Sequence, residues 1–328
     1  MESQAPPRKV LFIKTNVSTV GPTNALLIST LQKRGIQVEK RGWYPPGSLT
    51  LEDLTSYHSI NFLNCWEYNL HITAFHQFLK EVIAPAEAAG VKIVNPVEVL
   101  LWNSDKEYLR DLQRDVGINI PESIFVETLL GGIPAYEDVI SALEPDGAYG
   151  TVIKPSISAA SNMTHRIPHP SSELYDSAKT QANWAEVYEY TRDLSASAKV
   201  IIQAFEPAIK NGEYSIFFLG GEYSHTVLKK PAETDYRAME RFGARVRELK
   251  DEEVPLAGKE IGRKIVEYVE RRFGTGDDWR LGYLRVDGVV RDDGTFVVIE
   301  AEMLEPYVFL DVEGAKDGLE RLCDALGS

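Results

Sequence analysis

The sequence lacks the residues and motifs that mark several large protein classes. Its 328 residues include two cysteines, Cys65 and Cys323, without CxxC spacing, so neither a disulfide framework nor a zinc knuckle is encoded. The six histidines show no HxxEH pattern. No GxxxxGK[ST] segment occurs, and the loop KTNVSTVGPT has one glycine where a dinucleotide-binding loop needs three. These absences exclude a P-loop NTPase and argue against NAD binding.

Long hydrophobic runs and an excess of positive charge are also absent. No stretch of about 18 apolar residues occurs, and the N-terminus, MESQAPPRKV, has no basic segment followed by an apolar one. The chain carries 49 acidic and 35 basic residues, a formal charge of −14, which disfavours binding to nucleic acid or to anionic membrane surfaces. We therefore expect a cytoplasmic protein that acts on small molecules, with its oligomeric state left open.

The hydrophobic pattern predicts an α/β fold with three domains. Strands and helices alternate up to about residue 94, as VLFI, 22–34, IQVEK, INFLNCW, 70–89 and VKIVNP. This alternation is typical of a parallel sheet covered by helices. Further helices are expected over 103–116, 172–194 and 258–272, with strands at TVIK and KVIIQAF and two hairpins in the last third. The predicted boundaries are 1–102 for an N-terminal α/β domain, 103–203 for a small central lobe and 204–328 for an antiparallel-sheet domain.

The second hairpin, YLRVDGVVRDDGTFVVIEAEML, has a register that can be worked out. A two-residue Asp-Gly turn at 293–294 sets Asp287 opposite Glu300 and Arg285 opposite Glu302. Side chains alternate along a strand, so these four share one face. The opposite, core-facing side is predicted to hold Val297, Ile299, Ala301 and Met303.

The charged face of this hairpin has more negative than positive charge. Facing carboxylates repel each other, and a hard cation such as Mg²⁺, which prefers carboxylate and phosphate oxygens, would neutralise them. On this register alone, Glu300→Gln is expected to be neutral or stabilising without metal. The alternative is a solvated sheet face with one ion pair between Arg285 and Glu302.

Two lysines precede this hairpin in the chain. Lys154 ends the apolar run TVIK and is followed by a loop of small residues that includes Ser156, Ser158 and Ser161. Such a loop lets backbone amides and hydroxyls approach an anion. Lys106 lies near a predicted helix start. A single lysine is more often a solvated surface residue, but the order of both lysines before the carboxylates favours a phosphate site.

Together these segments resemble the ATP-grasp superfamily, and more closely its branch of glutathione synthetase-like and D-cycloserine-forming (O-ureido-serine cyclo-ligase) enzymes. The resemblance spans about residues 95–306 and preserves the family's order. The matching segments are NPVEVLLWNSDKEYL, TVIKPSISAAS, VIIQAFEPAIKNGEYSIFFLGGEYSHTVLKKP, YLRVDGVV and VVIEAEMLEP.

The resemblance implies an ATP-grasp fold with ATP held between the central lobe and the C-terminal domain. Lys106 and Lys154 would contact the α and β phosphates. The implied hinge against adenine and ribose is Gln203, Ala204, Phe205 and Glu206, and further nucleotide contacts would come from Glu213 and Lys229. The implied metal ligands are Asp287, Glu300 and Glu302, and the arginines that brace the γ phosphate would be Arg237 and Arg285.

The activity implied by the resemblance is that of a carboxylate–amine ligase of the EC 6.3 type, which forms a C–N bond through a phosphorylated carboxylate and releases ADP and phosphate. Its cofactors would be ATP and one or two Mg²⁺ ions, with Mn²⁺ as a substitute. Many relatives have asparagine where this chain has Glu302, which leaves the number of ions open. The alternatives are an ATP-grasp kinase, an intramolecular cyclo-ligase acting on a small amino-acid-like metabolite, and a non-catalytic nucleotide-binding regulator. Trp66, Tyr68 and Trp102 are predicted to line the substrate pocket.

Overall fold

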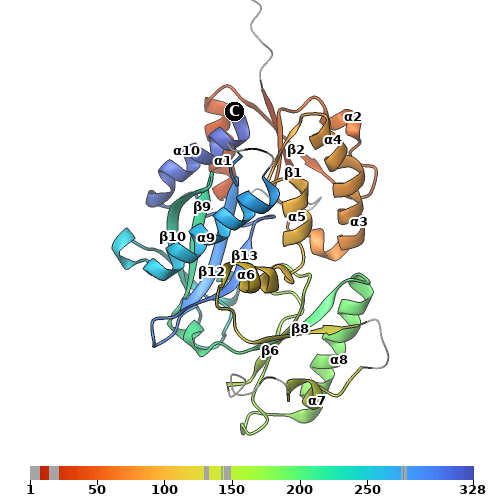
Figure 1. Cartoon of the computed structure of the whole chain (residues 1–328), viewed down its shortest axis with the longest axis vertical. Coiled ribbons are helices and arrows are strands. Elements are labelled where there is room, and N and C mark those ends of the chain that lie inside the picture. Colours follow the sequence, from red (N-terminus) through yellow and green to blue (C-terminus); the bar gives the residue numbers. More distant parts are fainter. Residues whose placement is uncertain are drawn as a thin grey trace, which may run out of the picture.

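The strands of the chain form three sheets, two of four strands and one of five. The computed structural model describes residues 8–14, 22–128, 133–141, 143, 149–274, 276 and 279–328, so most of the KTNVSTVGPT loop lies outside the described residues. In Figure 1 the sheet next to α8 (Ser177–Leu194) lies at one end of the long axis, and α1 (Pro22–Lys33) and α10 (Lys316–Gly327) lie near the other. Each predicted segment contains one sheet; the domain boundaries stay a prediction.

The first sheet is parallel, as the alternating pattern predicts. Residues 10–13 are fully buried, because helices cover both faces of the sheet. One face packs on α1 and α10, and the other on the helical segment 72–88. The strand order is β2-β1-β3-β4. The bounds are β1 (Lys9–Lys14), β2 (Gln37–Gly42), β3 (Ser59–Asn64) and β4 (Lys92–Val94).

The helices around this sheet differ from the prediction in two places. The predicted helix over 70–89 is α3 (Ile72–Phe78), a π-helical turn over 79–83 and α4 (Ala84–Ala88), preceded by the short α2 (Leu51–Leu54). The predicted helix over 103–116 is interrupted: α5 (Val97–Asn103) ends and α6 (Tyr108–Val116) begins after a turn. The N–H of Lys106 in this turn donates to the Ser156 carbonyl at 2.9 Å, which holds Lys106 next to the second sheet.

The second sheet is antiparallel and is covered by α8, which packs Trp184, Val187 and Tyr188 on it. Its strand order is β5-β8-β6-β7. Lys154 ends the apolar run of β6, as predicted. The elements are β5 (Ser123–Glu127), α7 (Tyr136–Ile140), β6 (Thr151–Pro155), β7 (His165–Ile167) and β8 (Lys199–Ala204).

The third sheet is antiparallel, and its strand order is β11-β10-β9-β12-β13. The predicted Gly-Gly hairpin is confirmed, because β9 and β10 pair across Gly220 and Gly221. Helix α9 packs closely on this sheet: a Cβ at Gly262 would lie 2.2 Å from the Phe218 ring. The elements are β9 (Glu213–Leu219), β10 (Glu222–Lys230), β11 (Arg245–Glu248), α9 (Leu256–Phe273), β12 (Tyr283–Val290) and β13 (Phe296–Glu302).

The register of β12 and β13 confirms the predicted pairs but not the turn. Arg285 faces Glu302 and Asp287 faces Glu300. The N–H of Arg291 donates to the Thr295 carbonyl, so the loop has three residues, 292–294, instead of two. A register shift beyond Asp287 leaves Ile299 as an extra residue in β13, which restores the predicted pairs.

This bulge reverses the side-chain alternation toward the turn, so half of the predicted core face is wrong. Ala301 and Met303 lie in the core with Val298, as expected. Val297 packs instead in a separate small cluster with Ala208 and Val289. Ile299 lines the large cavity described below. One inserted residue exchanges the two faces of a strand, which alternation alone cannot reveal.

Two buried asparagines join the first sheet to the third. The Asn95 side chain accepts from the Gly282 N–H at 2.8 Å and donates to the carbonyls of Tyr283 and Met303 at 2.9 and 2.8 Å. Asn103 donates to the Ala301 carbonyl at 2.7 Å and accepts from the Met303 N–H at 2.6 Å. These bonds position the end of β13 against the first sheet.

Both cysteines are buried and free, as predicted. Burial raises the pKa of Cys65 and of Cys323, which keeps both thiols protonated. None of the described helices combines the length and apolar character that crossing a bilayer requires.

Candidate active site

A cavity of about 670 Å³ lies where residues of the second and third sheets meet the loop after β3 and the turn between α5 and α6. Every residue predicted to contact ATP or the metal, except Ser156, lines it. These residues are Lys106, Lys154, Ser158, Ser161, Gln203, Ala204, Phe205, Glu206, Glu213, Lys229, Arg237, Arg285, Asp287, Glu300 and Glu302.

The two predicted phosphate-binding lysines lie close together and have different partners. Lys106 Nζ donates to the Ser158 carbonyl at 2.6 Å and lies 3.3 Å from a Glu300 oxygen. Lys154 Nζ is buried and donates to the Gln203 amide oxygen at 3.1 Å. Burial, and then the positive charge of Lys106, lowers the pKa of Lys154 to about 8. An ammonium held in this way would be stabilised by an arriving phosphate.

The loop after β6 contributes two of its three predicted serines. Ser158 and Ser161 line the cavity, and Ser161 adopts a left-handed backbone with φ of 53°. Ser156 is fully buried; its N–H donates to the Lys199 carbonyl and its hydroxyl accepts from the Lys199 N–H. Ser156 therefore holds the loop against β8 and does not face the cavity, which corrects the prediction. A buried hydroxyl is bonded inside the protein, and composition does not show which serine that is.

The predicted hinge, residues 203–206, lies beside the same cavity. The N–H of Ala204 donates to the Glu122 carbonyl and that of Phe205 to the Gly150 carbonyl, so neither donor is available to adenine. The Glu206 carboxylate pairs with Arg291 at 2.8 Å and accepts from the Ala208 N–H. The Phe205 ring lies under the Arg166 guanidinium, 3.7 Å from its centroid, as one wall of the cavity.

The predicted metal residues form an ion network with Arg285. Arg285 Nε lies 2.9 Å from an Asp287 oxygen, and its guanidinium also pairs with Glu302 and, at 4.0 Å, with Glu300. Despite the cost of burial, Asp287, Glu302 and Glu300 together raise the pKa of Arg285 further. The guanidinium is thus held by carboxylates and is not directed freely into the cavity.

Glu213 and Lys229 complete the network from the neighbouring strands. They face each other across β9 and β10 and form an ion pair. Lys229 Nζ also lies 3.2 Å from an Asp287 oxygen, and the Ser215 hydroxyl donates to that carboxylate. Burial alone would raise the pKa of Asp287, but Arg285 and Lys229 hold it below its usual range. Asp287 therefore stays ionised.

The other two carboxylates differ in their charge states. Burial opposes ionisation of Glu300, but Lys106 and Arg285 outweigh it and lower its pKa. Burial raises the pKa of Glu302 to about 7, opposed by Arg285 and reinforced by Glu300 and Asp287. Near neutral pH, Glu302 is thus protonated in part of the molecules, and a bound cation would displace that proton.

The donor chemistry fits Mg²⁺, which binds in nucleotide sites through one or two carboxylates and the substrate's phosphates. Among the described side chains, no group of three or more His, Cys, Asp or Glu converges on one point as a ready-made metal site. The protein by itself thus provides an incomplete coordination shell. Phosphate oxygens would have to complete it, as expected for a metal that enters with ATP.

Arg237 lines the cavity from a loop after β10. It pairs with Asp235 at 2.7 Å and stacks on the Phe242 ring, 3.4 Å from its centroid. The ion pair with Asp235 neutralises much of the charge of Arg237. The role of Arg237 at the γ phosphate stays a prediction.

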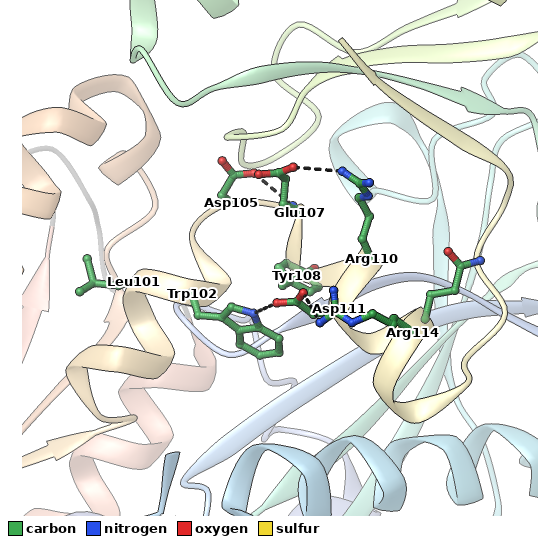
Figure 2. Close-up of a pocket in the computed structure, with 9 residues that line it drawn as sticks. Leu101, Trp102, Asp105, Glu107, Tyr108, Arg110, Asp111 and Arg114 are labelled. Carbon is green, nitrogen blue, oxygen red and sulfur yellow. Dashed lines mark hydrogen bonds and ion pairs between the residues drawn. The ribbon is translucent and has the colours of Figure 1, made fainter. Parts of the chain in front are cut away.

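Two of the three predicted substrate-pocket aromatics, Trp66 and Tyr68, line the cavity. Trp102 does not. Figure 2 shows that it lines a separate pocket beside α6, where its indole N–H donates to Asp111 at 2.8 Å. Asp111 also pairs with Arg114, and Glu107 pairs with Arg110. The prediction for Trp102 is wrong because α5 directs this side chain toward α9 and Phe273.

Three cavity residues near the end of β13 were missed: Ile299, Glu305 and Tyr307. Ile299 was assigned to the core because the bulge was not foreseen. Glu305 and Tyr307 lie beyond the end of β13, where strand alternation no longer places side chains. The acidic character of Glu305, three positions after Glu302, was the one feature of the sequence that could have indicated a site residue here.

This arrangement of sheets is the ATP-grasp fold, as solved structures confirm. D-cycloserine synthetase DcsG is similar with a TM-score of 0.75 and 20% identity, over 97% of this chain and 98% of that one. D-alanine–D-alanine ligase from Bacillus anthracis has a TM-score of 0.66 and 16% identity, over 97% and 96%. A RimK domain ATP-grasp protein from Sphaerobacter thermophilus has a TM-score of 0.61 and 16% identity, over 98% and 100%. No protein-family model and no curated protein matches the sequence.

Proposed function

We propose that the protein is an ATP-dependent ligase that joins a carboxylate to an amine. One observation carries this proposal. Lys154 is a buried ammonium whose hydrogen-bond partner is an amide oxygen, and it lines the same cavity as the carboxylates of Asp287, Glu300 and Glu302. A cavity that combines lysine ammonium groups with carboxylates, the oxygen ligands that Mg²⁺ prefers, suits a triphosphate with Mg²⁺. The solved ATP-grasp structures support the same reading.

The roles follow from the contacts. Lys106 and Lys154 neutralise phosphate oxygens, while Asp287, Glu300 and Glu302 would hold Mg²⁺, which offsets the charge of the transferred group. The substrate carboxylate oxygen attacks the γ phosphorus, and the bond to the bridging oxygen of ADP breaks. The neutral amine then attacks the carbonyl carbon of the acyl phosphate, the bond from that carbon to the phosphate oxygen breaks, and the departing phosphate takes up the proton that the amine loses. This sequence needs no encoded catalytic base.

We also propose that the second sheet with α8 closes over the nucleotide. The loop 158–161 projects from this sheet into the cavity, and transfer to the substrate must outcompete hydrolysis, so water has to be excluded. The domain boundaries 1–102, 103–203 and 204–328 belong to this proposal.

A phosphate-release screen of carboxylates paired with amines tests the ligase. Phosphate release that needs both partners supports it. A phosphorylated product formed without an amine indicates a kinase, release with one amino-acid-like substrate indicates a cyclo-ligase, and nucleotide binding without turnover indicates a regulator. Lys154→Met should abolish turnover in the first three cases.

A further inference from the structure

Glu305 is a buried carboxyl group of the cavity that the proposed reaction does not use. Its exposed fraction is 6%, and it lines the cavity. It has no hydrogen bond and no ion pair with any residue that the structure describes, whereas Glu213, Asp287, Glu300 and Glu302 are all paired. Burial, and then the charge of Glu302, raises the pKa of Glu305 well above its usual range, so a ligand that brings a positive charge would favour the ionised carboxylate and be bound by it.

Glu305 lies close to the ion network, since Glu302, Arg285 and Glu300 all act on its carboxyl group. Its charge acts on Tyr68, in the loop after β3, where burial and then Glu305 raise the pKa of the phenol well above its usual range. In open parallel sheets, ligands bind outside the carboxyl ends of the strands, and this loop follows such an end. Glu305 thus lies between the ion network and the edge of the first sheet where a substrate is expected.

Aromatic side chains line the same cavity as Glu305. They include Trp66, Tyr68 and Tyr307, and Tyr307 is braced edge-to-face by Phe309 at a centroid distance of 4.6 Å. Aromatic faces attract organic cations, but they are not ligands for Mg²⁺, which needs several oxygens. One carboxyl group with aromatic rings in the same cavity therefore favours an ammonium group over a metal ion as the ligand of Glu305.

We infer that Glu305, with Trp66, Tyr68 and Tyr307, binds a positively charged amino group of the substrate. This inference rests on the proposed ligase function and narrows it: one of the two substrates carries an ammonium group that is anchored here while another part of it reaches the carboxylate network. Glu305 is then a specificity-determining residue.

Saturation-transfer NMR with ethylammonium chloride tests this site without knowledge of the substrate. The neutral probe n-propanol, of nearly the same size, serves as the comparison. The wild type should show saturation transfer to ethylammonium and much less to n-propanol. Glu305→Gln should weaken ethylammonium binding at least about tenfold, because it removes a charge-assisted bond. Glu67→Gln, the matched control, removes a nearby charge that does not line the cavity and should change nothing.

Tyr307→Leu provides a second variant with no change in charge. It should weaken ethylammonium binding several-fold through the lost ring face, even if Glu305→Gln folds poorly. Equal transfer to both probes, or unchanged ethylammonium binding in folded Glu305→Gln, would overturn the inference. The inference would also be overturned if Glu305→Gln lost Mg²⁺-dependent binding of AMP-PNP but kept ethylammonium binding, because Glu305 would then be a metal ligand.

The same samples separate this inference from the proposed function. Calorimetry with Mg²⁺ and AMP-PNP measures nucleotide binding, and ethylammonium is titrated with and without the nucleotide analogue. Nucleotide binding without ethylammonium binding refutes the ammonium site and leaves the ligase standing. Ethylammonium binding without nucleotide binding refutes the ligase and shows that Glu305 binds amines for another purpose.

Discussion

Replacing Glu302 with glutamine should raise stability and abolish activity. The pKa of Glu302 lies at about 7 instead of 4.5. Each pH unit of this difference is worth about 1.4 kcal/mol, so ionised Glu302 costs the folded protein at most about 3 kcal/mol. Glutamine removes that charge and keeps the shape. At an unfolding entropy of about 2.1 cal/mol/K per residue, the Tm of the whole chain would rise by up to about 4 °C.

The pH dependence gives this prediction its sign. At pH 8 both the folded and the unfolded protein have lost the Glu302 proton, and the folded protein carries the full cost. As the pH falls from 7 toward 4.5, the folded protein keeps the proton and the cost disappears. The advantage of Glu302→Gln should therefore be present at pH 8 and nearly absent at pH 5. Scanning calorimetry in a metal chelator at both pH values measures it.

Glu300→Gln is the informative control. On turn register alone, removing repulsion between facing carboxylates predicts a neutral or stabilising change. The structure reverses this sign, because Lys106 and Arg285 lower the pKa of Glu300 and its ionised form is the stabilised one. This variant should melt earlier than the wild type at pH 8. Both variants should lose most phosphate release with Mg²⁺ and ATP.

The reasoning fails if Glu302→Gln melts no later than the wild type at pH 8 without metal and keeps near-normal turnover. That combination would mean that Glu302 is a structural partner of Arg285 and not part of a metal site.

Three further outcomes are expected. Lys154→Met should weaken ATP binding about tenfold or more at pH 7, while Lys179→Met, an exposed control, changes little in calorimetry. Wild-type affinity should also fall as the pH rises through about 8, since free Lys154 then loses the proton that bound phosphate retains, and Lys154→Met should lack this fall; a pH-independent wild type would contradict the assignment. Amide exchange in 156–161 should slow with Mg²⁺ and AMP-PNP, and unchanged exchange would argue against lid closure. Gly262→Ala should lower the free energy of unfolding by about 1–3 kcal/mol, and the Tm with it, because its Cβ would overlap Phe218. An unchanged melting curve would show that the helix shifts freely.

The sequence by itself determined the parallel first sheet and the positions of the hairpins, because these depend on local patterns such as alternation of apolar residues and Gly-Gly or Asp-Gly turns. The charged face of the second hairpin followed from its register, whereas the hinge 203–206, Glu213, Lys229 and Arg237 were expected from the resemblance to ATP-grasp enzymes. The predicted pairs of Asp287 with Glu300 and of Arg285 with Glu302 are correct, although the three-residue turn and the bulge at Ile299 each depart from the prediction and their effects on the register cancel.

Only the tertiary structure decided which polar groups face the cavity and in what charge state. Ser156 and Ser158 are two residues apart in one loop, yet one is bonded inside the protein and the other lines the site. Trp102 follows α5 away from the site, and Glu305 enters it after β13 has ended. The shifted pKa values of Lys154 and Glu302 arise from burial and from charges distant in sequence. These properties depend on which segments meet in space, and no local pattern encodes that.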